Sequence, residues 1–194
     1  RNIMPAPYKV AVIVGSLRKD SYNRKMAHAL ARLAPDTLSL EIVEIGDLPL
    51  FSQDFEKALP SAVVAFKSRI QAADAVLFIT PEYNRSVPGV LKNAIDCGSR
   101  PYGTSVWSGK PGGVVSVSTG AVGGFGANHH LRQSMVFLDV PMMGQPEAYL
   151  GGAFVKGRAN SGSAIAPHAP FGPPATPPGV DGRLSDRRCI GAAK

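Results

Sequence analysis

A short loop near the N-terminus, residues 15–23, carries side chains that could bind an anion. Hydroxyl and amide groups can donate hydrogen bonds to such a ligand, and a guanidinium adds positive charge. These side chains belong to Ser16, Arg18, Ser21 and Asn23. A buried apolar run precedes the loop and a helical pattern follows it, so backbone N–H groups and the positive end of a helix dipole meet there. The loop therefore predicts a phosphate site.

An ordinary strand-to-helix connection remains open for this loop, because Ser and Asn also cap helices. The G-x-G-x-x-G pattern of dinucleotide-binding folds and the G-x-x-x-x-G-K-[ST] pattern of P-loops are both absent from it. If the loop binds a phosphate, it does so without either of these signatures.

A second loop, residues 80–87, has the composition to hold a flat ring. Pro81 and Pro88 stiffen it, Tyr83 offers an aromatic face, and the backbone amides of residues 82–84 can meet a ring edge. Glu82 has two open interpretations, as an acid/base group or as a helix cap, of which the cap is the commoner. A third loop, 118–126, contains four glycines that let main chain approach a ligand closely. A phosphate at one end and a planar ring between rigid loops predict a mononucleotide ligand.

Five apolar segments alternate with amphipathic ones at βαβ spacing, which predicts an α/β fold with a doubly wound parallel sheet and helices on both faces. In such sheets ligands bind beyond the carboxyl ends of the strands, where all three loops would lie. The predicted strands are 8–14, 38–45, 75–79, 114–117 and one beginning at Val140–Met143, and the predicted helices are 22–34, 61–72, one starting after Pro88, and 126–138.

The length and charge of the chain exclude several classes of protein. The 194 residues suit one domain, and no apolar run approaches a membrane span. The net charge is +7, but residues 151–194 carry six Lys or Arg against two Asp or Glu, and no basic helix appears, so a nucleic-acid partner is not expected. Cys97 and Cys189 form no metal-type pair. We expect a cytoplasmic protein without a bound metal or a membrane partner.

Four stretches resemble the NAD(P)H-dependent FMN reductases, and more closely the branch of chromate and quinone reductases. They are VGSLRKDSYNRK, TPEYNRSVPGVLKNAID, GKPGGVVSVSTGAVGG and HHLRQSMVFLDVPMM…PEAYL, and the likeness covers residues 8–150 in order. The resemblance implies a flavodoxin-like sheet of order 2-1-3-4-5 and bound FMN. It assigns the FMN phosphate to Ser16, Arg18, Ser21 and Asn23, the isoalloxazine ring to Pro81, Glu82, Tyr83 and Asn84, and its other edge to Ser118 and Gly120.

The implied reaction is ping-pong: NADPH or NADH reduces the flavin, which then reduces a small-molecule electron acceptor. Acceptors in the family include quinones, free flavins, azo compounds and metal oxyanions such as chromate, and the assembly is a homodimer or homotetramer. No catalytic side chain is implied, because the flavin carries the chemistry. Two alternatives stay open, a flavodoxin-type electron carrier and a non-catalytic flavin-binding protein.

The last 44 residues, 151–194, do not match the family. They contain eight Gly and six Pro and show no helical apolar period, so they predict a divergent, irregular or disordered tail. If the helix expected there is missing, we predict that Phe154, Val155, Ile165 and Phe171 cover the sheet surface it would have covered.

Overall fold

The computed structural model describes residues 6–152, and the structural statements below concern this part of the chain. The strands are Tyr8–Val14 (β1), Leu38–Val43 (β2), Ala75–Thr80 (β3), Gly112–Val117 (β4) and Ala148–Leu150 (β5). The helices are Tyr22–Leu33 (α1), Ser61–Gln71 (α2), Gly89–Ser99 (α3) and Phe125–Phe137 (α4), with a short 3-10 helix at Gln53–Lys57 (η1). The predicted tail lies outside the described residues, apart from its first two.

All five strands are parallel, in the order β2-β1-β3-β4-β5, which is the flavodoxin-like order that the resemblance implies. The order reverses between β1 and β3, since β2 lies on one side of β1 and β3 on the other. Strands β1, β3 and β4 are central and mostly buried, whereas β2 alternates between exposed and covered positions at the edge. The continuous apolar runs therefore mark the central strands, as expected for a parallel sheet covered on both faces.

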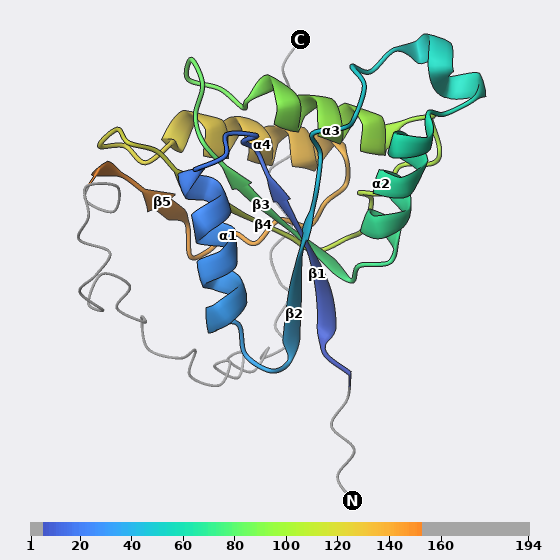
Figure 1. The fold of residues 1–194 in the computed structure, drawn as a ribbon. Helices are drawn as coiled ribbons and strands as arrows, with labels where there is room; N and C mark the ends of the chain where they lie inside the picture. The colour runs from blue at the N-terminus through green and yellow to red at the C-terminus, as the bar shows by residue number, and fades with distance from the viewer. Residues whose placement is uncertain (1–5, 153–194) are drawn as a thin grey trace, which may run out of the picture. The chain divides into compact units, whose positions relative to one another are not determined.

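Helices cover the two faces of the sheet unequally (Figure 1). Helices α2, α3 and α4 pack on one face around a large core that includes Phe78, Leu91, Trp107 and Leu131. Helix α1 packs on the opposite face through Met26 and its neighbours, against the other sides of β1, β3 and β4. Helix α1 thereby brings its N-terminus, and the loop before it, to the carboxyl edge of the sheet.

The prediction that a fifth strand begins at Val140–Met143 is wrong. These residues make only an isolated bridge, between Met142 and Gly112 at the start of β4. The chain then leaves the sheet over residues 144–147, where Pro146 has no N–H to give to a ladder, and rejoins β4 as β5. The apolar pattern could not reveal this interruption, because both segments pair with the same strand.

Candidate functional site

The three predicted ligand loops meet at the carboxyl edge of the sheet. Gly15, in the first loop, donates its N–H to a carbonyl at the end of β3, at 2.8 Å. Asn23, at the start of α1, reaches β4, where its Nδ2 donates to the carbonyl of Val117 at 3.2 Å. The N–H of Ala127, in the first turn of α4, donates to Oε2 of Glu82 in the second loop, at 3.1 Å. These bonds tie the first loop to the ends of β3 and β4, and the second loop to α4, around the point where the strand order reverses, which is the expected ligand position in such sheets.

The first loop presents backbone donors at the N-terminus of α1. Within residues 6–152, six of its N–H groups make no hydrogen bond: those of Ser16, Leu17, Lys19, Asp20, Tyr22 and Asn23. The Ser21 hydroxyl is the N-cap of α1 and accepts the N–H of Arg24 at 3.4 Å. The Arg18 guanidinium lies over the ring of Tyr22, 5.1 Å from its centroid. Helix capping and anion binding are therefore compatible here, because open N–H groups remain beside the cap.

Asn23 holds a buried acceptor without a partner. Its side chain is almost fully enclosed, and Oδ1 has no hydrogen bond within the described residues. Such an atom costs about 1–3 kcal/mol if it stays unsatisfied. A ligand hydroxyl or N–H at this position would remove that cost.

The second loop is a tight two-residue hairpin. Tyr83 and Ser86 exchange both backbone hydrogen bonds, at 3.1 and 3.0 Å, and the two residues between them, Asn84 and Arg85, both have positive φ. This is the backbone pattern of a type I′ turn. The N–H of Tyr83 is therefore used within the turn, which corrects the expectation that all three amides of 82–84 are open. The amides of Glu82 and Asn84 make no hydrogen bond within the described part of the chain.

Glu82 acts as a helix cap, the commoner of its two interpretations. The N-cap residue of α4, Gly124, has no side chain to cap the helix, and the Glu82 carboxylate from the second loop takes that role at Ala127. Its side chain is only 10% exposed, and it also pairs with Arg85 at 3.4 Å. A negative charge at a helix N-terminus is favourable, so the bond fastens the ring-edge hairpin to α4.

The third loop packs closely against the end of β5. Gly123 and Gly124 have φ of 61° and 81°, and a Cβ on Gly123 would lie 2.8 Å from the backbone nitrogen of Leu150. Ser118 donates its N–H to the Leu150 carbonyl at 3.0 Å, and its hydroxyl accepts the N–H of Gly120 at 3.3 Å. Ser118 is half-buried and Gly120 is exposed; the family resemblance assigns both to the second ring edge, and this role stays a prediction.

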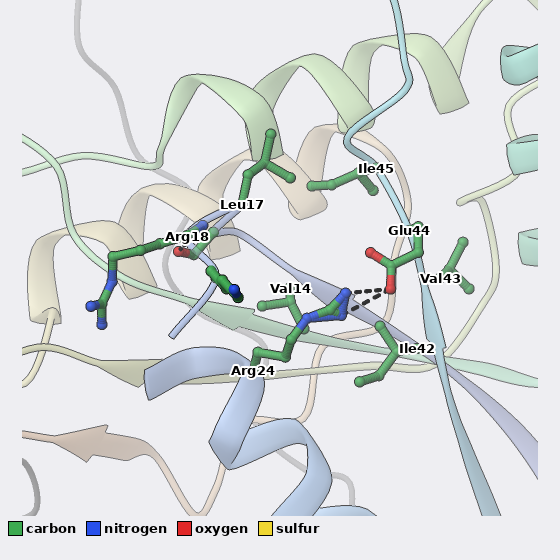
Figure 2. A pocket seen from close by; sticks show the side chains of 10 residues that line it. Val14, Leu17, Arg18, Arg24, Ile42, Val43, Glu44 and Ile45 are labelled. Atoms are coloured by element: carbon green, nitrogen blue, oxygen red, sulfur yellow. Dashed lines mark hydrogen bonds and ion pairs between the residues drawn. The ribbon is translucent and has the colours of Figure 1, made fainter. Parts of the chain in front are cut away.

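A pocket of about 290 Å³ opens between the first loop and the carboxyl ends of β1 and β2 (Figure 2). An ion pair between Arg24 and Glu44 lies in it. The sequence analysis predicts no role for Arg24 or Glu44. The available signal was weak: a carboxylate directly after a strand that ends at the ligand edge. The pocket is lined by Val14, Ser16, Leu17, Arg18, Lys19, Arg24, Ile42, Val43, Glu44 and Ile45.

Together, the flavodoxin-like sheet and the donor-rich loop at its switch point are typical of the class of proteins that bind a mononucleotide at the carboxyl edge of the sheet. A sequence profile of the NADPH-dependent FMN reductases matches residues 8–154, and the chain belongs to that family. It is therefore an oxidoreductase that uses FMN and NAD(P)H. The site fits the cofactor: the open N–H groups suit a phosphate, and the orphaned Asn23 Oδ1 suits a hydroxyl.

Similar proteins include several reductases. A quinone reductase of Pseudomonas putida is 68% identical over 151 residues, which are 77% of this chain and 81% of the relative. A 2-hydroxy-1,4-benzoquinone reductase of a Burkholderia species is 55% identical over 142 residues, 73% of this chain and 78% of the relative. Among solved structures, the flavoenzyme NAD(P)H:(acceptor) oxidoreductase FerB of Paracoccus denitrificans matches with a TM-score of 0.71 and 47% identity, covering 74% of this chain and 79% of that one.

Residues 6–152 lack both a membrane-spanning helix and a cluster of metal ligands. No helix there is both long and apolar enough to cross a membrane. No group of three or more His, Cys, Asp or Glu side chains in the same residues could hold a metal ion.

Proposed function

We propose that this chain is an NAD(P)H:quinone oxidoreductase whose two half-reactions use one FMN site in turn. The net reaction is NAD(P)H plus H⁺ plus quinone giving NAD(P)⁺ plus hydroquinone, so two electrons pass and the acceptor gains two protons. The names of the relatives at 68% and 55% identity support a quinone as the acceptor. Free flavins, azo compounds and metal oxyanions such as chromate are further acceptors that the family resemblance predicts.

One observation carries the proposal: open N–H donors and a buried acceptor without a partner lie side by side at the switch point. Bound FMN supplies the two-electron chemistry. The chain's own residues position it. Ser16, Arg18, Ser21 and Asn23 are proposed to hold the phosphate end, as the sequence predicts. Asn23 would do so through its backbone N–H, because its side-chain Nδ2 already donates to Val117 and its Oδ1 can only accept a hydrogen bond.

The second and third loops are proposed to hold the ring. The amides of Glu82 and Asn84 can donate to its edge, and Pro81 and Tyr83 can flank it, because the hairpin is rigid and bonded to α4. Ser118 and Gly120 are proposed to meet the opposite edge. Since Tyr83 is 52% exposed, one side of this region stays open for NAD(P)H and the acceptor to enter in turn.

The first experiment is the visible spectrum of the purified protein, before and after anaerobic addition of NADPH, followed by a quinone. We expect a yellow protein whose flavin band bleaches and then returns with hydroquinone formation. A yellow protein that does not bleach would favour the carrier or the non-catalytic flavin-binding protein. A colourless protein that takes up no FMN would overturn the proposal.

The phosphate assignment has a separate test, the ratio of affinities for FMN and riboflavin. Arg18→Ala should weaken FMN binding and leave riboflavin binding unchanged, because only FMN carries the phosphate. The matched control is Arg32→Ala, which removes an arginine from the last turn of α1, at the opposite end of the helix from the first loop. Equal loss for both flavins would contradict the assignment. Homodimer or homotetramer assembly and a cytoplasmic location stay predictions.

A further inference from the structure

The pocket at the ends of β1 and β2 is separate from the proposed ring site but adjoins the proposed phosphate site, because Ser16 and Arg18 line it too. It has an apolar floor, formed by Val14 and Ile42 of the two strands and by Ile45 just after β2, and a charged rim (Figure 2). Its volume, about 290 Å³, is at the low end for ligand pockets, so it suits one end of a large ligand rather than a whole dinucleotide.

The charged rim contains an ion pair that a ligand can open. Arg24 donates through both terminal nitrogens to the same oxygen of Glu44, with Nη1 at 2.8 Å. The second oxygen, Oε2, and the Arg24 Nε make no hydrogen bond within the described residues. The two side chains are 34% and 60% exposed, and exposed pairs contribute little stability. Arg24 can therefore exchange Glu44 for a more highly charged partner.

Glu44 and Arg24 are the residue types that bind the adenosine ribose of NADH, which has a 2′-hydroxyl, and of NADPH, which has a 2′-phosphate. In dinucleotide-binding proteins a carboxylate accepts hydrogen bonds from the ribose 2′-hydroxyl of NADH, and a nearby arginine accommodates the 2′-phosphate of NADPH. Here the carboxylate and the arginine face one another over an apolar floor that can contact a base. Lys19 adds a second cation to the rim, whereas Figure 2 shows Arg18 pointing away from the ion pair. Two cations against one carboxylate favour the phosphorylated form.

The pocket also lies within reach of the ring site. Neighbouring strands are about 4.8 Å apart, and β1 separates β2 from β3, so the pocket is about 10 Å along the sheet edge from the second loop. An extended dinucleotide whose nicotinamide lies over the ring can span that distance.

We infer that this pocket binds the 2′-phosphoadenosine end of NADPH, with Arg24 on the 2′-phosphate, and that Glu44 competes for Arg24 and so limits the preference for NADPH over NADH. This inference rests on the proposed function only where it concerns NADPH turnover. Binding of the adenosine end can be measured without turnover.

The test uses the FMN-loaded protein and two probes, 2′,5′-ADP and 5′-AMP, in calorimetry. The wild-type protein should bind 2′,5′-ADP more tightly than 5′-AMP. Arg24→Ala should weaken 2′,5′-ADP binding at least about tenfold and leave 5′-AMP binding unchanged, since a charge-assisted hydrogen-bonded pair is lost. Glu44→Gln should strengthen 2′,5′-ADP binding, because Arg24 is released.

The matched control is a second ion pair, between Arg69 of α2 and Glu41 of β2. It lies beside a different pocket. Arg69→Ala should change neither affinity. In steady-state assays Arg24→Ala should raise the KM for NADPH and leave that for NADH unchanged. Equal affinities for the two probes in the wild type, or an unchanged 2′,5′-ADP affinity in Arg24→Ala, would overturn the inference. Normal probe binding without any NADPH oxidation would instead count against the proposed function alone.

Discussion

Oε2 of Glu82 accepts the backbone N–H of Ala127 at 3.1 Å, although 45 residues separate the two in the chain. The bond joins the proposed ring-edge hairpin to the first turn of α4. It makes the conformation of the second loop depend on α4, which begins at the end of the third loop.

Removing this cap should destabilise the fold. Glu82→Ala takes away the carboxylate that caps α4, and we expect the free energy of unfolding to fall by about 0.5–2 kcal/mol, the usual range for a lost cap. Urea denaturation measures the change. Glu41→Gln, on a surface ion pair with 75% exposure, is the control and should cost no more than about 1 kcal/mol. Equal small effects in both variants would show that Glu82 does not stabilise α4.

Gly126→Ala should disturb the hairpin from the other side. A Cβ there would lie 2.7 Å from the Arg85 carbonyl oxygen and 3.0 Å from Oε2 of Glu82, so the hairpin must move. We expect weaker FMN binding, by about tenfold or more if the shift costs about 1.4 kcal/mol of binding free energy. Gly89→Ala, whose Cβ would meet nothing within 4 Å, should keep wild-type affinity. Fluorescence titration with FMN compares the two, and equal affinities would argue against the hairpin as a ring contact.

Asn23→Ala should affect cofactor binding more than folding. The Val117 carbonyl loses its amide donor, but the unpartnered Oδ1 is removed with it, so the two effects oppose each other and we expect only a small change in the stability of the FMN-free protein. The gain in melting temperature on adding FMN should shrink, because Oδ1 is no longer available to the ligand. An unchanged FMN-induced gain in Tm would separate Asn23 from the cofactor and leave it a purely structural residue.

Tyr149 should make the fold sensitive to alkaline pH. Burial, followed by the hydrogen bond and charge of Glu147, raises the pKa of Tyr149 from 10.0 to about 12. The folded state then holds the phenol proton more tightly than the unfolded state. Its contribution to stability is complete below pH 10 and is lost as the pH rises from about 10 to about 12.

Denaturation curves across this pH range test the point. Tyr149→Phe should lose less stability between the two pH values than the wild type does. Tyr102→Phe removes a phenol that is 89% exposed and should keep the wild-type slope. If the slope of Tyr149→Phe equals that of the wild type, the raised pKa does not contribute to folding.

Much of the fold is predictable from local pattern. The runs before Gly15 and before Pro81 are apolar because central parallel strands are buried on both faces, and their ends therefore mark the edge where a ligand binds. Of the ten residues proposed for the FMN site, nine lie in the loops at this edge, and Asn23 lies in the first turn of α1 directly after the first loop. The family motifs supplied their roles, which periodicity alone could not.

The sequence by itself determined the alternation of strands and helices and the position of the three loops, because each depends on residues close together in the chain. The phosphate chemistry of the first loop stays a prediction. Only the tertiary structure decided that Glu82 caps α4, that the Tyr83 amide is used within its own turn, and that Arg24 meets Glu44 in a pocket. It also decided that the last strand is interrupted before Ala148. These features depend on which distant segments become neighbours and in what register, and no local pattern of apolar and polar residues encodes that choice.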